Sequence, residues 1–73
     1  ASTCEIAREL IAGMPNCPPR TKIRLRDAVD RYGKYRKMGV GHDNALTLAQ
    51  RPLAYSHRSK FRELIGKASH SAY

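Results

Sequence analysis

The sequence predicts a small all-α protein, a three- to four-helix orthogonal bundle that forms a single domain over residues 1–73. Apolar residues recur at spacings of three and four along several stretches, which is the pattern of amphipathic helices. Glycines and prolines interrupt the chain between these stretches, and no stretch alternates apolar and polar residues as a strand would. A chain of 73 residues has room for one modest core, which is too small to wall a deep pocket for a small molecule.

The first helix is expected to begin at Ser2, because Ser2 followed by Glu5 is a capping-box pattern. Gly13 and Pro15 are expected to end it, and the proline-rich segment 15–20 predicts an extended connector. One buried face is predicted by an apolar stripe that comprises Ile6, Ala7, Leu10, Ile11 and Met14.

The second helix is expected to run from Thr21, as its N-cap, to about Met38. Gly39 and Gly41 surround a single apolar residue and predict a C-terminal cap followed by a sharp turn. Apolar side chains share one side of this helix: Leu25, Ala28, Val29, Tyr32 and Tyr35. Basic side chains cover the opposite side, and two acids are spaced for exposed ion pairs four residues on, Asp27 with Arg31 and Asp30 with Lys34.

Asp43 is expected to cap a short third helix, which Pro52 either ends or follows as the first residue of the fourth helix. Residues 69–73 are expected to form a frayed tail. The apolar stripe of the fourth helix comprises Leu53, Ala54, His57, Phe61, Leu64, Ile65 and Ala68.

The net charge of +8 is concentrated in two of these helices. Residues 21–37 carry +5 and residues 51–67 carry +4, whereas residues 1–20 are neutral and residues 38–50 carry −1. Charge arranged in this way indicates an anionic partner, either nucleic acid or the acidic surface of a protein machine. The candidate contact residues are Lys22, Arg26, Arg31, Lys34, Lys37, Arg58, Lys60 and Arg62.

Sequence motifs of catalysis are absent, and we expect neither an enzyme nor a cofactor, a small-molecule substrate or a metal site. Cys4 and Cys17 are either two unpaired thiols or one disulfide. They form no CxxC pair, which is the spacing typical of a zinc site. No apolar run approaches membrane-spanning length, so no membrane partner is expected. The start at Ala1 suits a chain that has lost its initiator methionine, and we expect a cytoplasmic protein.

Two hypotheses of nucleic-acid binding follow from the charge pattern. Residues 21–50 have the length of a helix-turn-helix around Gly39, which would bind DNA. Two features disfavour this hypothesis: Tyr35 occupies a position where close helix packing requires a small residue, and the third helix lacks positive charge. Residues 31–37 interleave Tyr32 and Tyr35 with cations, which is typical of sequence-tolerant RNA or single-strand binding. Both tyrosines fall on the apolar face, which favours a place in the core instead.

In its length, basicity, helical content and Ala-Ser-Thr start, the chain resembles the small phage regulators that bind host RNA polymerase, such as one from a Xanthomonas phage. This resemblance implies a phage protein of transcription regulation that binds bacterial RNA polymerase, inhibiting initiation or promoting antitermination. It rests on no diagnostic motif and assigns no residue. The hypothesis that follows is a non-catalytic regulator whose neutral first helix seats on polymerase, with nucleic acid as the alternative partner.

Overall fold

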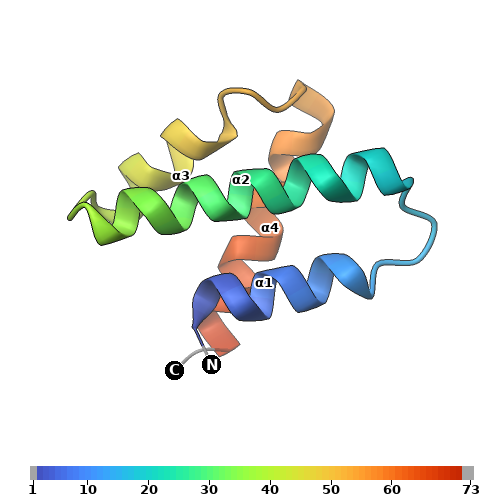
Figure 1. Cartoon of the computed structure of the whole chain (residues 1–73), viewed down its shortest axis with the longest axis horizontal. Coiled ribbons are helices and arrows are strands. Elements are labelled where there is room, and N and C mark those ends of the chain that lie inside the picture. The colour runs from blue at the N-terminus through green and yellow to red at the C-terminus, as the bar shows by residue number, and fades with distance from the viewer. Residues whose placement is uncertain (1, 72–73) are drawn as a thin grey trace.

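The computed structural model describes residues 2–71, in which four helices pack around one core (Figure 1). Helices α1 and α2 lie side by side and run in opposite directions, α3 lies on the other side of α2, and α4 crosses behind them at a steep angle (Figure 1). No strand occurs within residues 2–71, so the prediction of a small all-α bundle is confirmed. The helices are α1 Thr3–Ala12, α2 Pro19–Lys37, α3 His42–Gln50 and α4 Tyr55–Ser71.

The core consists of apolar side chains from all four helices and from the turn before α4. Phe61 of α4, Ile11 of α1 and Leu25 of α2 are its largest fully buried members. Burial of each such side chain contributes about 1.5–3 kcal/mol to folding. The other buried residues are Ala7, Ala28, Val29, Tyr32, Ala45, Leu46, Ala49, Leu53, Leu64, Ile65 and Ala68.

The predicted start of α1 is confirmed, whereas that of α2 is wrong. The Glu5 backbone N–H donates to Ser2 Oγ at 3.2 Å, which is the N-terminal cap that the Ser2–Glu5 spacing predicted. α2 begins at Pro19 rather than after Thr21, and its N-cap Pro18 supplies no side-chain hydrogen bond. Proline suits the first position of a helix because its fixed φ is already helical and its missing N–H would have had no partner there.

The turn after α2 has the geometry that its glycines predicted. Gly39 adopts a φ of 89°, in the left-handed region. The Val40 N–H donates to Tyr35 O at 3.0 Å and the Gly39 N–H to Arg36 O at 3.1 Å, a pair of bonds that defines a Schellman motif. Val40 and Tyr35 both pack against the core, which adds the apolar contact typical of this cap.

Three predicted details of the second half of the chain are wrong. α3 begins at His42 with Gly41 as its N-cap, so Asp43 lies inside the first turn instead of capping it. Leu53 is buried, but it lies in the turn that contains Pro52, before α4 begins at Tyr55. α4 continues to Ser71 instead of fraying at residue 69, because Ala68 is still buried where α4 packs on α1. Residues 72–73 of the expected tail lie outside the described residues.

Candidate nucleic-acid interface

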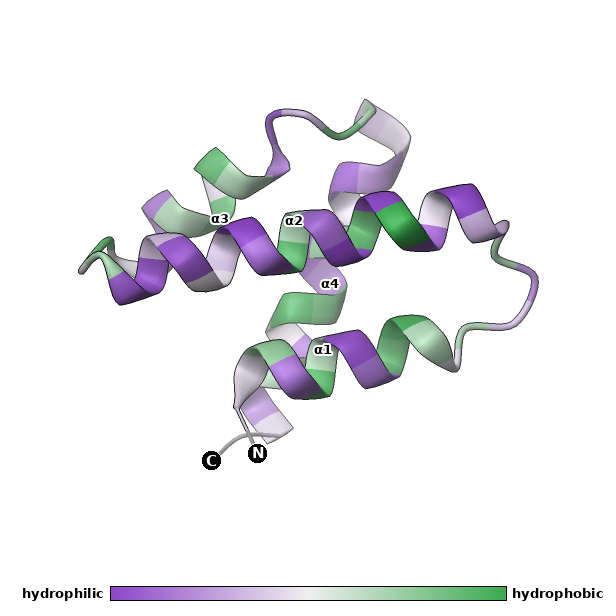
Figure 2. Ribbon diagram, in the orientation of Figure 1, coloured by the Kyte–Doolittle hydropathy of each residue, from purple (hydrophilic) through white to green (hydrophobic). Residues whose placement is uncertain are grey.

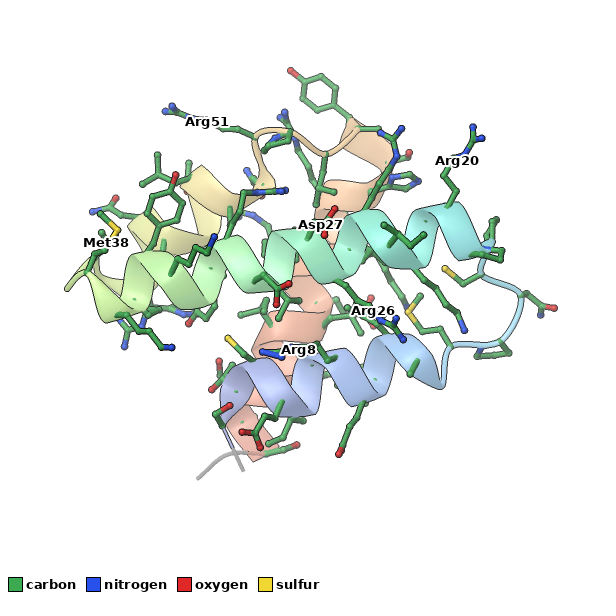
Figure 3. The ribbon with its side chains drawn as sticks, in the orientation of Figure 1. Arg8, Arg20, Arg26, Asp27, Met38 and Arg51 are labelled. Atoms are coloured by element: carbon green, nitrogen blue, oxygen red, sulfur yellow. The ribbon has the colours of Figure 1, made fainter. Side chains whose placement is uncertain are left out.

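Six basic side chains are exposed and have no hydrogen bond or ion pair with any other residue that the structure describes. Five of them lie on α2, whose 19 residues extend over about 28 Å. Figure 2 shows the visible face of α2 as hydrophilic over most of its length. In Figure 3, Arg26 extends on the side of α2 that faces α1, while Arg20 and Arg51 project on the opposite side of the view. We call this set the outer cations: Arg20, Arg24, Arg26, Lys34, Lys37 and Arg51.

Two other arginines bind the C-terminal end of α3. Arg31 of α2 donates from Nε and Nη2 to Ala49 O, at 3.2 and 3.0 Å. Arg62 of α4 donates from Nε to Gln50 Oε1 at 2.8 Å. The last carbonyls of a helix have no partner within the helix and carry partial negative charge, so cations there are stabilising. Arg31 and Arg62, both predicted as contact residues, therefore hold the fold together.

Arg58 fixes the turn between α3 and α4 and covers an aromatic ring. Its Nε donates to Leu53 O at 3.1 Å and its Nη2 to Arg51 O at 2.9 Å. The same guanidinium lies 4.3 Å from the centroid of the Tyr55 ring, although Tyr55 itself is 84% exposed. The sequence interpretation missed Tyr55 because it lies off the apolar stripe; the available signal was its spacing of three residues from Arg58 on one helix.

The remaining predicted contact residues divide between engaged and free side chains. Lys22 Nζ donates to Ala12 O at 3.0 Å, at the end of α1. Lys60 Nζ lies 3.8 Å and Lys67 Nζ 3.1 Å from the Glu63 carboxylate. The hydrogen bond from Lys67, with the positive charge of Lys60, lowers the pKa of Glu63 below its ordinary value. Three predicted contact residues remain among the outer cations: Arg26, Lys34 and Lys37.

The two ion pairs expected along α2 do not form. Asp30 Oδ1 instead lies 3.6 Å from Arg8 Nε, so this acid links α2 to α1. Arg31 turns toward α3 and leaves Asp27 beside a shallow groove of about 340 Å³ between α2 and the turn that joins α3 to α4. Neither Asp27 nor Asp30 neutralises Lys34, which stays free to meet an external anion.

A cleft of about 890 Å³ lies between the start of α1 and the second half of α2. Arg8 and Asp30 are paired inside it, and Cys4 lies at its wall with Sγ 3.8 Å from Val29 O. Burial raises the pKa of the Cys4 thiol, and Arg8 opposes this effect only in part. A thiol held protonated at neutral pH is a poor nucleophile, so the cleft contains no activated cysteine. It also contains cations of α2, namely Lys34, Arg36 and Lys37.

Cys4 and Cys17 are both free thiols. Cys4 lies in the first turn of α1, whereas Cys17 follows the end of that helix. The helix from Cys4 to Ala12 alone extends over about 12 Å, and a disulfide requires Cα atoms within about 7 Å. The unpaired alternative therefore holds, and the disulfide alternative is wrong.

The tyrosines of α2 are part of the fold. Tyr32 is only 4% exposed, and its hydroxyl lies 2.8 Å from His42 Nδ1. Tyr35 packs against the core. Tyr32 is buried and Tyr35 is half-buried, which disfavours the interpretation of residues 31–37 as a stacking segment. α3 carries Asp43 in its first turn and no lysine or arginine, which disfavours it as a base-reading helix.

Comparison with protein-family models, curated proteins and solved structures finds no match to this chain. Within residues 2–71, no three His, Cys, Asp or Glu side chains converge in a way that could hold a metal ion. None of the four described helices combines the length and the hydropathy needed to cross a membrane. The outer cations and the exposed Tyr55 are the surface features of residues 2–71 that suit a ligand.

Proposed function

We propose that this chain is a non-catalytic nucleic-acid-binding protein that holds the phosphate backbone through its outer cations. The observation that carries the proposal is the set of six exposed basic side chains that have no partner among residues 2–71. A cation of this kind is free to replace the counterions of a phosphate, and the release of those counterions drives association. A net charge of +8 adds attraction at long range.

The same features favour sequence-tolerant binding. Hydrogen bonds to base edges require polar or basic side chains on an element that enters a groove. α3, the element that would enter it in a helix-turn-helix, has Asp43 in its first turn, and its Gln50 side chain already accepts from Arg62. Contacts to phosphates position a protein on nucleic acid without reading its sequence.

Binding of fluorescently labelled 20-nucleotide single strands and of the matching duplex, followed by anisotropy from 50 to 300 mM NaCl, tests this proposal. About five phosphate contacts predict a log–log slope near −4 to −5 on duplex and about −3.5 on single strands. Strands of different sequence should bind within about three-fold of one another, since phosphate contacts carry no sequence information. Absence of binding at 50 mM salt would contradict the proposal.

A second candidate is a transcription regulator that binds bacterial RNA polymerase, and exposed apolar side chains on α2 favour it. Ile23 of α2 is 58% exposed and Met38, the C-cap that follows this helix, is 74% exposed, close in sequence to the five outer cations of α2. Apolar side chains within a charged surface are typical of protein interfaces. Ala7 and Ile11 of the α1 stripe are buried in the core and Leu10 is 37% exposed, less than Ile23, so docking would use α2 more than the neutral first helix.

Affinity capture of bacterial core polymerase by the tagged protein distinguishes the two candidates. Capture that survives nuclease treatment and 300 mM salt would support the polymerase candidate, whereas capture lost after nuclease treatment would support a nucleic-acid tether.

A further inference from the structure

We infer that Tyr55 is a stacking platform for an unpaired base, so that the nucleic acid held by this protein is single-stranded. The inference rests on the proposed nucleic-acid binding and names its substrate class. It draws on a different part of the molecule from the outer cations of α2, namely the turn between α3 and α4.

The Tyr55 ring has one occupied face and one open face. Arg58 lies over the ring at 4.3 Å from its centroid, and the tyrosine is nevertheless 84% exposed. A base that stacks on the open face would complete a guanidinium–ring–base sandwich, in which stacking and cation–π attraction act together. Every base has an aromatic face, so this contact agrees with sequence-tolerant binding.

The platform is held in place before any ligand arrives. Two hydrogen bonds, to Leu53 O and Arg51 O, fix the Arg58 guanidinium at the turn. The ring that lies against this guanidinium is limited in its orientations as a consequence. Ordering a free side chain on binding costs conformational entropy, and a preorganised platform avoids most of that cost.

Two cations near Tyr55 in the sequence are available for the flanking phosphates. Arg51 belongs to the outer cations and precedes Tyr55 by four residues. Arg62 follows Arg58 by one helical turn and uses only Nε in its bond to Gln50, which leaves both of its terminal amino groups free of hydrogen bonds within the described chain. A strand whose base stacks on Tyr55 can therefore place phosphates against Arg51 and Arg62 without loss of the bonds that hold the turn.

This arrangement selects single strands over duplex. In a duplex both faces of each internal base are covered by neighbouring bases, and the base must be unpaired and extruded before it can stack on a side chain. Single strands present unstacked bases at little cost. The outer cations on their own would bind either form.

The direct test compares Tyr55→Ala with the wild type on three labelled ligands of equal length: a dT12 strand, a 12-nucleotide abasic strand and a 12-base-pair duplex. We expect Tyr55→Ala to weaken binding of dT12 by roughly ten-fold. Binding of the abasic strand and of the duplex should stay within two-fold, and Tyr55→Phe should retain affinity for dT12. Unchanged circular dichroism of Tyr55→Ala confirms that the fold is kept.

A second variant provides an independent readout. The chain has no tryptophan, so Tyr55→Trp introduces a single indole at the platform, which can be excited selectively beside the remaining tyrosines. Stacking predicts that dT12 quenches its emission and the abasic strand does not.

The outcomes separate this inference from the proposed function. Equal loss of affinity on dT12 and on the abasic strand, or no loss on either, overturns the stacking platform and leaves phosphate binding standing. Failure of the wild type to bind any of the three ligands overturns both.

Discussion

The two sides of α2 use the same residue types for different purposes. On the side toward α3, Arg31 donates twice to Ala49 O and is part of the fold. On the side toward α1, Arg26 points outward and has no partner among the described residues. Lys22 lies on that same side but faces the end of α1, where it donates to Ala12 O. Arg31 and Lys22 thus become structural because the last carbonyls of a neighbouring helix lie opposite them, and Arg36 because it donates to Val40 O in the following turn at 3.1 Å, whereas Arg26 remains available for a ligand.

The largest effect on stability is expected from the bond between Arg31 and α3. Arg31→Met keeps most of the aliphatic stem but removes the donors to Ala49 O. A hydrogen bond to a charged group contributes about 1.5–3 kcal/mol, so Arg31→Met should lower the free energy of unfolding by about 2 kcal/mol. The matched variant Arg26→Met should change it by less than about 0.5 kcal/mol. Urea denaturation measures both values.

Equal destabilisation by Arg31→Met and Arg26→Met would show that the two sides of α2 do not differ in the way described. Destabilisation by Arg26→Met alone would mean that Arg26, and not Arg31, stabilises the fold.

A smaller effect is expected where α2 approaches α1. A Cβ at Gly33 would lie 2.9 Å from Cys4 Sγ, whereas a Cβ at Gly66 of α4 would meet nothing within 4 Å. Gly66→Ala should therefore stabilise the protein by about 0.5–1 kcal/mol, the usual gain at an open position inside a helix. In Gly33→Ala, the close contact with Cys4 Sγ should cancel that gain in stability. Thermal unfolding should show a higher Tm for Gly66→Ala than for Gly33→Ala.

A double-mutant cycle with Cys4→Ala tests whether the contact with Cys4 Sγ causes the lower stability of Gly33→Ala. In that background, which lacks Sγ, the cost of Gly33→Ala should shrink; an unchanged cost would place its origin elsewhere.

The faces and ends of the helices were predictable to the extent that they depend on local sequence. The apolar side of α2 was predicted correctly because periodicity reports burial directly, and Gly39 was predicted because its left-handed φ of 89° favours glycine. The predicted start of α2 was wrong because Thr21 and Pro19 both suit a helix start, and local sequence alone does not decide between them.

The division of the basic residues could not be predicted from the sequence. A helical wheel places Arg31 on the outer half of α2, but its role depends on where α3 ends in space. Tyr55 was missed for a related reason, since its exposure and its contact with Arg58 follow from the turn that carries Leu53 into the core. Periodicity predicts which residues are buried, whereas the partner of an exposed side chain depends on the tertiary arrangement.

The smallest effect on stability, and the most direct test of binding by the outer cations, comes from Lys34→Gln with Lys37→Gln. Both side chains are exposed and have no described partner, so the free energy of unfolding should change by less than about 0.5 kcal/mol. The matched control is Lys60→Gln with Lys67→Gln, which removes the same charge from lysines that pair with Glu63.

The decisive measurement is the salt dependence of single-strand binding by the wild type and these two double variants. Loss of two phosphate contacts predicts that the log–log slope of the Lys34/Lys37 variant is shallower than that of the wild type by about 1.4, while the slope of the Lys60/Lys67 variant stays within about 0.5 of the wild type. An equal change in both variants would mean that net charge alone governs binding, and an unchanged slope in the Lys34/Lys37 variant would contradict a role for these outer cations.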